Sequence, residues 1–388
     1  MKIVHTADWH VGRTLRGRSR ADEHRAVLAE LVELVDRERA DLVLVAGDVF
    51  DAAAPPPEAE RLVYRTLLDL ADSGAQVVVV AGNHDHPRRL DAVAPLLSLG
   101  RVTAAGAVAP PERGGVVELG TRSGESARIA LLPFLSRRGV VRAEALLRDA
   151  ADQHQAAYAE RIARIVAALC EGASSGAVNL LVGHLLVTGG TLGGGERAAH
   201  TVFDYAVPAA VFPADLHYVA LGHLHRPQRI AAGCPVWYAG SPLQLDFGET
   251  TDEKAALVVD VGPSRPAEVR RVPLRTGRRL RTLVGTPEEL QAQAGSVDDA
   301  YLKVVVRAAP RAGLAAQIRE WFPEAVDVVV DNPQRAAAAA DARDRRTGRS
   351  PSELFAAYLA ERGVDDPDVQ RLFDELHDAV VTPDAGPA

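Results

Sequence analysis

The segment 77-VVVVAGNHDHPRR-89 begins as an apolar run and ends abruptly in polar groups. Four consecutive valines fit a strand that is buried on both faces of a sheet. Gly82 allows the chain to turn tightly directly after that strand. Asn83 and His84, which follow, carry groups that bind metals or move protons. The segment therefore predicts a buried strand with a functional site at its carboxyl end.

Similar apolar runs recur along the chain, separated by segments with helical periodicity. One helical stripe, Leu28, Leu31, Val32 and Val35, has the i, i+3, i+4, i+7 spacing of a single helix face. This alternation is typical of βαβ units around a buried sheet. Between 236 and 273 the strand-like runs follow one another without helices, which predicts an antiparallel region. We expect a layered α/β domain over residues 1–275, with strands at 3–7, 42–46, 77–81, 129–132, 180–182 and 218–221.

A second, smaller unit is predicted at residues 276–331, after a basic turn at 275–281. Its pattern is a strand at 302–306, a helix at 313–322 and a strand at 326–330, which indicates a small α+β domain. Residues 332–349 are rich in alanine and charge, and this composition suits either a linker or a solvated helix.

The C-terminal segment 350–388 begins with a strong helix start. Ser350 and Glu353 form a capping-box pattern, and Pro351 occupies the first helical position. Two helices of this size cannot bury their own apolar face, so it must dock either on the body of the protein or on a partner. The first of these helices carries Leu354, Phe355, Tyr358 and Leu359.

The composition of the 388 residues is that of an ordinary soluble globular protein, with 47% hydrophobic and 25% charged residues. The apolar runs are far shorter than the roughly 20 residues that cross a bilayer, and Asp8 and His10 interrupt any signal-peptide core. We therefore expect a cytoplasmic protein without a membrane partner. Cys170 and Cys234 are too few for a disulfide framework.

The formal net charge of −8 argues against a general binder of polyanions. Any contact with nucleic acid would have to come from local cationic patches. One candidate is 13-RTLRGRSR-20, although its alternative interpretation is a solvated loop. Its arginines are Arg13, Arg16, Arg18 and Arg20.

Five predicted strands each end in potential metal ligands, and these ligands are Asp8, His10, Asp48, Asn83, His184, His223 and His225. Functional sites in α/β sheets form outside the carboxyl ends of strands, so we expect these side chains to meet at one edge. Carboxylate, imidazole and amide groups without thiolate suit manganese, iron or zinc. Seven ligands exceed the four of a tetrahedral site, which predicts two ions. Paired ions about 3.5–4 Å apart promote phosphoester hydrolysis.

Taken in order, the motifs Asp-x-His, Gly-Asp-x-x-Asp, Gly-Asn-His-Asp, Gly-His and Gly-His-x-His resemble those of the calcineurin-like metallophosphoesterases. The resemblance implies a four-layer α/β/β/α sandwich. The segments 1–15, 19–26, 45–51 and 240–249 narrow it to the SbcD family, the nuclease subunits of SbcCD complexes. Segment 351–363 is similar to the part of that family that binds its coiled-coil ATPase partner.

The resemblance also implies roles for single residues. Asp8, His10 and His225 would bind one ion, with Asn83, His184 and His223 binding the other and Asp48 bridging them; the expected metal is Mn²⁺. His84 would contact the scissile phosphate and assist the leaving group. We hypothesise that the carboxylate of Asp51 hydrogen-bonds His84 and keeps it protonated.

The function implied by the resemblance is that of a manganese-dependent DNA nuclease in DNA repair and recombination. It would act as a 3′→5′ exonuclease on double-stranded ends and as an endonuclease on hairpins or single strands, with an SbcC-like ATPase and as a homodimer of nuclease subunits. Arg13, Arg16, Arg18 and Arg20, together with Arg88 and Arg89, flank the metal motifs and could contact DNA phosphates.

Two other functions stay open on the sequence alone. A small-molecule phosphodiesterase or a protein phosphatase could use the same fold and metals, although neither needs the unit after residue 275 or the apolar tail. An inactive DNA-end-binding scaffold is the other alternative, and the complete ligand set argues against it.

Overall fold

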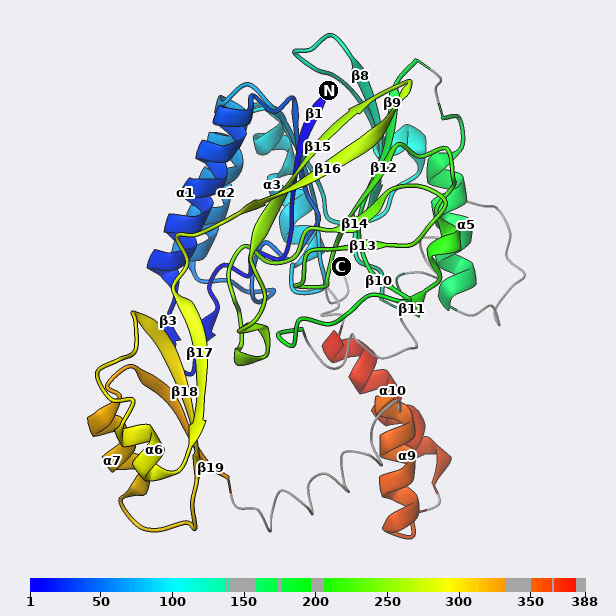
Figure 1. Ribbon diagram of the computed structural model, residues 1–388. Coiled ribbons are helices and arrows are strands. Elements are labelled where there is room, and N and C mark those ends of the chain that lie inside the picture. Colours follow the sequence, from blue (N-terminus) through cyan, green and yellow to red (C-terminus); the bar gives the residue numbers. More distant parts are fainter. Residues whose placement is uncertain are drawn as a thin grey trace.

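The structure is a computed structural model that describes residues 1–136, 139, 158–173, 176–196, 206–331, 350–364 and 366–381. Its centre is a pair of six-stranded sheets with helices outside them (Figure 1). The valine run lies in the first sheet, where Val77 to Val80 are fully buried.

The first sheet has a parallel part and an antiparallel edge. β1, β4, β5 and β6 are parallel, whereas β15 runs antiparallel to β1 and β16 antiparallel to β15. In spatial order the strands are β16 (Arg265–Pro273), β15 (Ala255–Gly262), β1 (Lys2–Thr6), β4 (Leu42–Val45), β5 (Gln76–Val80) and β6 (Val102–Ala105).

The second sheet is also mainly parallel. Its order is β13 (Gln228–Ile230), β14 (Val236–Tyr238), β12 (Tyr218–Gly222), β9 (Val178–His184), β8 (Ser126–Leu132) and β7 (Val116–Gly120). The prediction of an antiparallel region from residue 236 is wrong for β14, which pairs in parallel with β12. The segment between β12 and β14 contains β13, which lies on the outer edge of the sheet and pairs antiparallel with β14. β14 returns between β13 and β12 and therefore runs parallel to β12.

The alternation of side chains along the strands creates the layers. Leu42 and Leu44 of β4 point between the sheets, into a core shared with Leu180 and Val182 of β9. Val43 and Val45 of the same strand point outward, against the helices. α1 (Ala21–Glu38), α2 (Pro57–Asp72) and α3 (Pro87–Ser98) cover the first sheet, and α5 (Tyr158–Cys170) covers the second (Figure 1). The expected α/β/β/α sandwich is therefore confirmed.

The second unit contains three parallel strands joined by helices, β17 (Arg279–Gly285), α6 (Pro287–Gln291), β18 (Ala300–Arg307), α7 (Leu314–Trp321) and β19 (Ala325–Asp331). The predicted basic turn at 275–281 is wrong in its last part, because β17 begins at Arg279. Leu280 is 1% exposed and packs with Tyr301, Leu15 and Phe247. Burial of this leucine draws the basic segment into a strand.

Several short elements complete the body of the protein. The hairpin of β2 (Thr14–Leu15) and β3 (Arg18–Ser19) reaches the second unit. Within the described residues, the others are β10 (Leu186–Val187), β11 (Ala206–Val207) and the 3₁₀ turns η1 (Pro111–Arg113), η4 (Ala209–Val211) and η5 (Phe247–Glu249).

The C-terminal segment forms a helical hairpin of α9 (Pro351–Glu361) and α10 (Pro367–Val381), below the sandwich in Figure 1. The predicted capping box is present, because Ser350 and Glu353 each accept from the other's backbone N–H. The Phe355 and Phe373 rings stack with centroids 4.0 Å apart. Residues 332–349, predicted as a linker or helix, lie outside the described residues. None of the described helices is long and apolar enough to cross a membrane.

Candidate metal centre

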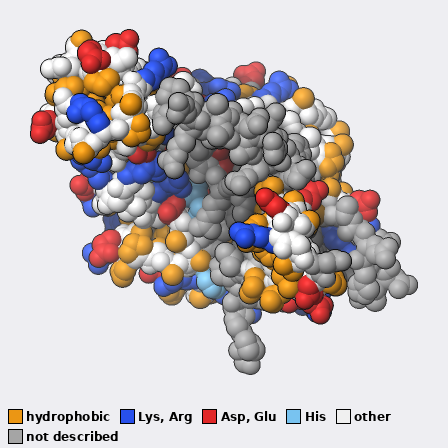
Figure 2. All heavy atoms as spheres, turned by 90° about the horizontal axis from the view of Figure 1, so that it is seen from below, with side chains coloured by type: hydrophobic (Ala, Val, Ile, Leu, Met, Phe, Trp, Pro, Cys, Tyr) orange, Lys and Arg blue, Asp and Glu red, His pale blue; other side chains and the backbone are white. Residues whose placement is uncertain are grey.

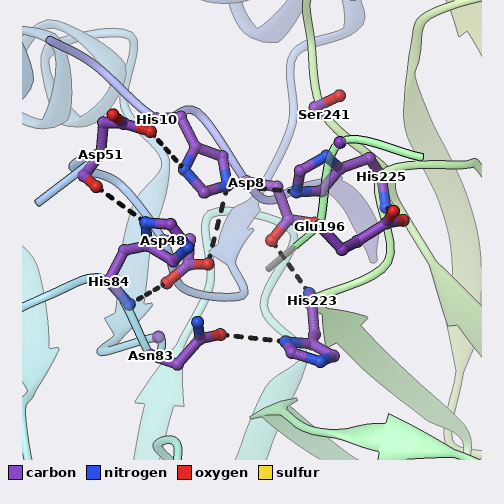
Figure 3. A network of polar contacts seen from close by, with 12 residues as sticks. Asp8, His10, Asp48, Asp51, Asn83, His84, Glu196, His223, His225 and Ser241 are labelled. Carbon is purple, nitrogen blue, oxygen red and sulfur yellow. Dashed lines mark hydrogen bonds and ion pairs between the residues drawn. The ribbon is translucent and has the colours of Figure 1, made fainter. Parts of the chain in front are cut away.

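The predicted ligands meet where the two sheets face each other (Figure 3). Asp8, Asp48 and Asn83 follow β1, β4 and β5 of the first sheet, whereas His184 ends β9 and His223 follows β12 of the second. The expectation of one common sheet edge is therefore incomplete. The carboxyl ends of strands from both sheets converge, and the ligands come from opposite sides of the sandwich.

The backbone at this convergence adopts unusual conformations. Asp8, His10, Asp48 and His223 have φ angles of 53°, 48°, 51° and 105°. Positive φ values are uncommon for residues other than glycine and cluster at functional sites. At Gly82 an added Cβ would collide with the backbone and carboxylate of Asp48. These tight turns hold the ligand loops against one another.

We call Asp8, His10 and His225 the Asp8 half of the centre. One ligand atom from each of the three residues lies within 4.8 Å of the others, and the Nε2 atoms of His10 and His225 are 3.2 Å apart. A carboxylate stands behind each ring, because Nδ1 of His225 is 2.8 Å from Glu249 Oε1 and Nδ1 of His10 is 3.3 Å from Asp51 Oδ1. Carboxylates at Nδ1 favour a proton there, which leaves the Nε2 lone pairs facing each other.

We call Asn83, His184 and His223 the Asn83 half. Oδ1 of Asn83 lies 2.8 Å from Nε2 of His184 and 2.9 Å from Nδ1 of His223. Nδ1 of His184 donates to the backbone carbonyl of Ala46 at 2.8 Å. In the neutral ring, the lone pair on Nε2 of His184 therefore points at another acceptor.

Asp48 lies between the halves. Its Oδ2 is 3.6 Å from Nε2 of His10 and 3.4 Å from Nε2 of His184. Its Oδ1 accepts from the backbone N–H of His84 at 2.7 Å. Asp48 is 2% exposed, so it reaches both halves from a fixed, dry position.

These residues fit divalent cations. Oδ2 of Asp8 is buried and has no hydrogen-bond partner among the described residues. Burial raises the pKa of Asp8 to about 7 even though His184 and His225 favour its charged form. Burial opposes protonation of His184 too, but Asp48 and Asp8 raise its pKa to about 9. In the metal-free protein, protons on histidines such as His184 offset the charge of these buried carboxylates, and two cations would take the place of those protons.

The predicted contact between the Asp51 carboxylate and His84 is wrong. Nδ1 of His84 donates to the backbone carbonyl of Asp51 at 2.7 Å. The carboxylate of Asp51 points instead to His10 and to Arg13, whose Nη1 is 3.3 Å away. Burial opposes its ionisation, but His10 and Arg13 lower the pKa of Asp51 to about 2. The carbonyl still fixes the ring, and the ligand atom of His84 lies within 4.8 Å of those of His10 and Asp48.

Some residues behind the ligands were not assigned from the sequence. Asp85 accepts from the N–H groups of Gly82 at 2.8 Å and Phe50 at 3.0 Å, so it ties the loops after β4 and β5 together. Glu196 accepts from the backbone N–H of His225 at 3.0 Å. Asp85 lies in the segment 77–89, directly after Asn83 and His84, and Glu249 is the last residue of segment 240–249, which resembles the SbcD family. These two positions were the only hints in the sequence that Asp85 and Glu249 belong to the site.

The arginines predicted to contact DNA have different environments. Arg20 is 1% exposed and bonds to Glu23 and the carbonyl of Gln244. It is therefore a structural residue, and its assignment to DNA is wrong. Arg13, Arg16 and Arg18 form ion pairs with acidic residues of the protein, namely Asp51, Asp246, Asp327 and Glu324. Arg88 and Arg89 are exposed, and Arg89 pairs with Glu60 at 2.8 Å.

Comparisons with known proteins agree with the geometry. A family model described as "Calcineurin-like phosphoesterase" matches residues 1–227, and one described as "Type 5 capsule protein repressor C-terminal domain" matches residues 276–362. The chain is 38% identical over 284 residues to the SbcD protein of the SbcCD nuclease of Bacillus subtilis, covering 72% of this chain and 71% of that protein.

Two further relatives carry the same name. The SbcD protein of Rhodobacter capsulatus is 32% identical over 384 residues, covering 92% of this chain and 94% of the relative. That of Escherichia coli K12 is 31% identical over 301 residues, covering 76% and 73%.

Proposed function

Since the chain belongs to the SbcD family of calcineurin-like phosphoesterases, we propose that it is the metal-dependent DNA nuclease subunit of an SbcCD-type complex. Membership of this family makes the protein a hydrolase of phosphodiester bonds. The proposed substrates are double-stranded ends, cut in the 3′→5′ direction, and hairpins or single strands, cut internally.

The observation that carries the proposal is the pair of ligand sets that share Asp48. The Asp8 half and the Asn83 half each present two histidines and one oxygen ligand, and Asp48 lies within 3.6 Å of a histidine nitrogen in both. Two divalent cations, which we propose to be Mn²⁺, would neutralise phosphate oxygens and activate water at such a centre. Asp48 then sets the separation of the two halves.

The proposed role of His84 follows from its hydrogen bond. Because Nδ1 donates to the carbonyl of Asp51, the other ring nitrogen, Nε2, is the one that would address a phosphate held by both halves. When Nε2 carries a proton, it can donate it to the leaving oxygen or to a phosphate oxygen. A backbone carbonyl orients the ring without adding charge, so His84 depends less on neighbouring side chains than His10 does.

DNA would contact the protein through local cationic groups. Acidic and basic side chains are interspersed on the described part of the face in Figure 2, in keeping with the net charge of −8. Arg88 is an exposed candidate, whereas Arg13, Arg16, Arg18 and Arg89 would have to exchange protein carboxylates for phosphates. We therefore expect only a few phosphate contacts from the nuclease subunit itself.

The remaining parts of the proposal concern organisation. We propose a nuclease domain at 1–275, a capping domain for DNA recognition at 276–331, a linker at 332–349 and an ATPase-binding segment at 350–388, in a cytoplasmic homodimer of nuclease subunits. Tyr358 is 49% exposed on α9, which supports the docking of an SbcC-like coiled-coil ATPase. Leu354 and Phe355 are partly buried beside it, whereas Leu359, predicted as part of the same face, is buried and does not belong to the exposed surface.

The test is cleavage of an end-labelled hairpin duplex with Mn²⁺, with and without the candidate ATPase subunit. His84→Ala should lower the cleavage rate about 10²–10⁴-fold, the usual share of general acid catalysis, while Mn²⁺ binding stays within about threefold. His86→Ala is the matched control. His86 lies two residues away, and its side chain only caps α3 by accepting from Arg89 N–H, so this variant should cleave at nearly the wild-type rate.

Two results would redirect the assignment. Rapid hydrolysis of a cyclic nucleotide without DNA cleavage would favour the small-molecule phosphodiesterase. A protein that binds DNA ends but hydrolyses no phosphoester with Mn²⁺ would be the inactive scaffold.

A further inference from the structure

A buried ionic network stands directly behind His225 and has no role in the function described so far. Glu249 is 0% exposed, and Lys254 is 6% exposed. Oε1 of Glu249 lies 2.8 Å from Nδ1 of His225, while Oε2 lies 2.6 Å from Nζ of Lys254. Burying such a pair is costly unless geometry and hydrogen bonds compensate, so its presence here requires an explanation.

We propose that Glu249 is a positioning residue that fixes the tautomer and orientation of His225, and that Lys254 holds Glu249 in place. This inference deepens the proposed function, because it rests on the Asp8 half binding a divalent cation. Glu249 touches neither the cation nor the substrate. It acts only through the imidazole ring.

The contacts fix both the ring and the backbone of His225. Lys254 Nζ donates to the carbonyl of His225 at 2.9 Å and to Oγ of Ser241 at 2.9 Å, in addition to pairing with Glu249. Oε2 of Glu249 also accepts from the N–H of Leu245 at 2.9 Å. Two close donors therefore hold Oε2, with Ser241 Oγ farther away at 3.5 Å, and this leaves Oε1 to receive the proton on Nδ1 of His225. The Nε2 lone pair then faces the Asp8 half.

The glycine-rich loop 189–196 closes the network from the other side. At Gly195 an added Cβ would collide with Oε1 of Glu249 and lie 2.9 Å from Nδ1 of His225. Only a residue without a side chain allows the backbone to approach the contact this closely. The close approach explains why position 195 is a glycine, and it places the loop over the hydrogen bond between Glu249 and His225.

The other half of the centre has a different support. Nδ1 of His184 donates to the backbone carbonyl of Ala46, which no side-chain substitution removes. Glu249 should therefore affect the ion of the Asp8 half and leave the ion of the Asn83 half nearly unchanged. This selectivity separates positioning of His225 from a general loss of structure.

The experiment is a titration of metal-free protein with Mn²⁺ in which free Mn²⁺ is followed by electron paramagnetic resonance. In Glu249→Gln the two donors at Oε2 select the amide oxygen, so the amide NH₂ faces Nδ1 and drives the proton to Nε2. We expect one ion to bind about 10–100-fold more weakly, the range seen for groups that orient metal ligands. The other ion should stay within about threefold of wild type.

Two further variants make the result decisive. Glu249→Gln/Lys254→Met leaves no unpaired buried charge, while Leu245 N–H still selects the amide oxygen, so the loss of one ion should persist. Glu38→Gln is the matched control. Glu38 also pairs with cationic side chains, Lys2 at 3.2 Å and Arg270 at 2.9 Å, but it lies on α1, which contributes no residue to either half. It should bind both ions as wild type does, and circular dichroism should show all variants folded.

Other outcomes overturn the proposal. Wild-type binding of both ions by Glu249→Gln would do so, as would equal weakening of both ions in a folded variant. Recovery of the lost ion in the double variant would mean that an unpaired lysine charge, not the orientation of His225, caused the effect. A wild-type protein that binds two ions but cuts no DNA would instead refute the proposed function and leave the role of Glu249 standing.

Discussion

The Asp8 half and the Asn83 half of the candidate metal centre present similar side chains but differ in the groups that orient their histidines. In the Asp8 half, the carboxylates of Asp51 and Glu249 face Nδ1 of His10 and His225. In the Asn83 half, the backbone carbonyl of Ala46 serves His184. A carbonyl at the end of a strand is fixed by the fold, whereas a side-chain carboxylate must itself be held in place. The orientation of His184 therefore depends on the sheet, whereas that of His10 and His225 depends on side-chain carboxylates.

The largest expected effect removes the residue that both halves share. Asp48→Ala should lower nuclease activity by about 10³-fold or more, the scale of losing a central group that acts as part of a unit. The variant should also bind both ions more weakly, because Oδ2 of Asp48 is close to a histidine of each half. Cleavage rates and Mn²⁺ stoichiometry check this prediction. Loss of only one ion would show that Asp48 belongs to a single half.

A smaller effect is expected from the other carboxylate of the Asp8 half. Asp51→Asn should lower the affinity for one ion about tenfold, which is at the low end of the losses expected for groups that orient metal ligands. The loss is small because Asp51 is partly exposed and its carboxylate lies 3.3 Å from Nδ1 of His10. The carbonyl that holds His84 is retained in this variant. The pH–rate profile at saturating Mn²⁺ should therefore match the wild type. A shifted profile would restore the hypothesis that the carboxylate controls His84.

The last effect concerns folding stability and not activity, and it comes from a buried histidine outside both halves. Burial and the adjacent Arg20 lower the pKa of His24 to about 4 from its ordinary value of 6.5. Below pH 6.5 the unfolded chain binds a proton that the folded protein does not bind, so His24 favours folding above that pH and its contribution is lost between pH 6.5 and 4. The slope is at most about 1.4 kcal/mol per pH unit.

Denaturant unfolding of wild type and His24→Gln over this pH range measures the contribution of His24. The variant should show a shallower loss of stability, and the difference should be the same with and without Mn²⁺. A difference that changes with Mn²⁺ would connect His24 to one of the halves.

Much of the fold could be predicted because local pattern and burial agree. The run Val77–Val80 is a strand buried on both faces, and the capping box at Ser350 begins a helix as expected. The seven candidate ligands also come together near the carboxyl ends of strands, but they come from two sheets and not from the one edge that was predicted. The strand that begins at Arg279 could not be predicted, because its first apolar residue, Leu280, stands between two arginines and the segment therefore looks like a basic turn.

The supporting contacts could not be predicted because they join residues far apart in the chain. The Asp51 carbonyl, not its side chain, meets His84, and no sequence pattern distinguishes these two oxygens. Arg20 looks like the other arginines of its loop, but it folds inward to Glu23 and Gln244. Glu249 and His225 are 24 residues apart, with no periodicity linking them.

The joint between the nuclease body and the second unit has a consequence for measurements in salt. Ion pairs bridge it, with Arg16 3.1 Å from Asp327 and Arg18 3.2 Å from Glu324. Mobile ions screen such exposed pairs as readily as they screen contacts to phosphate. A plot of activity against ionic strength should thus be steeper than the number of bound phosphates alone dictates, because each increment of salt also weakens the ion pairs between the two units.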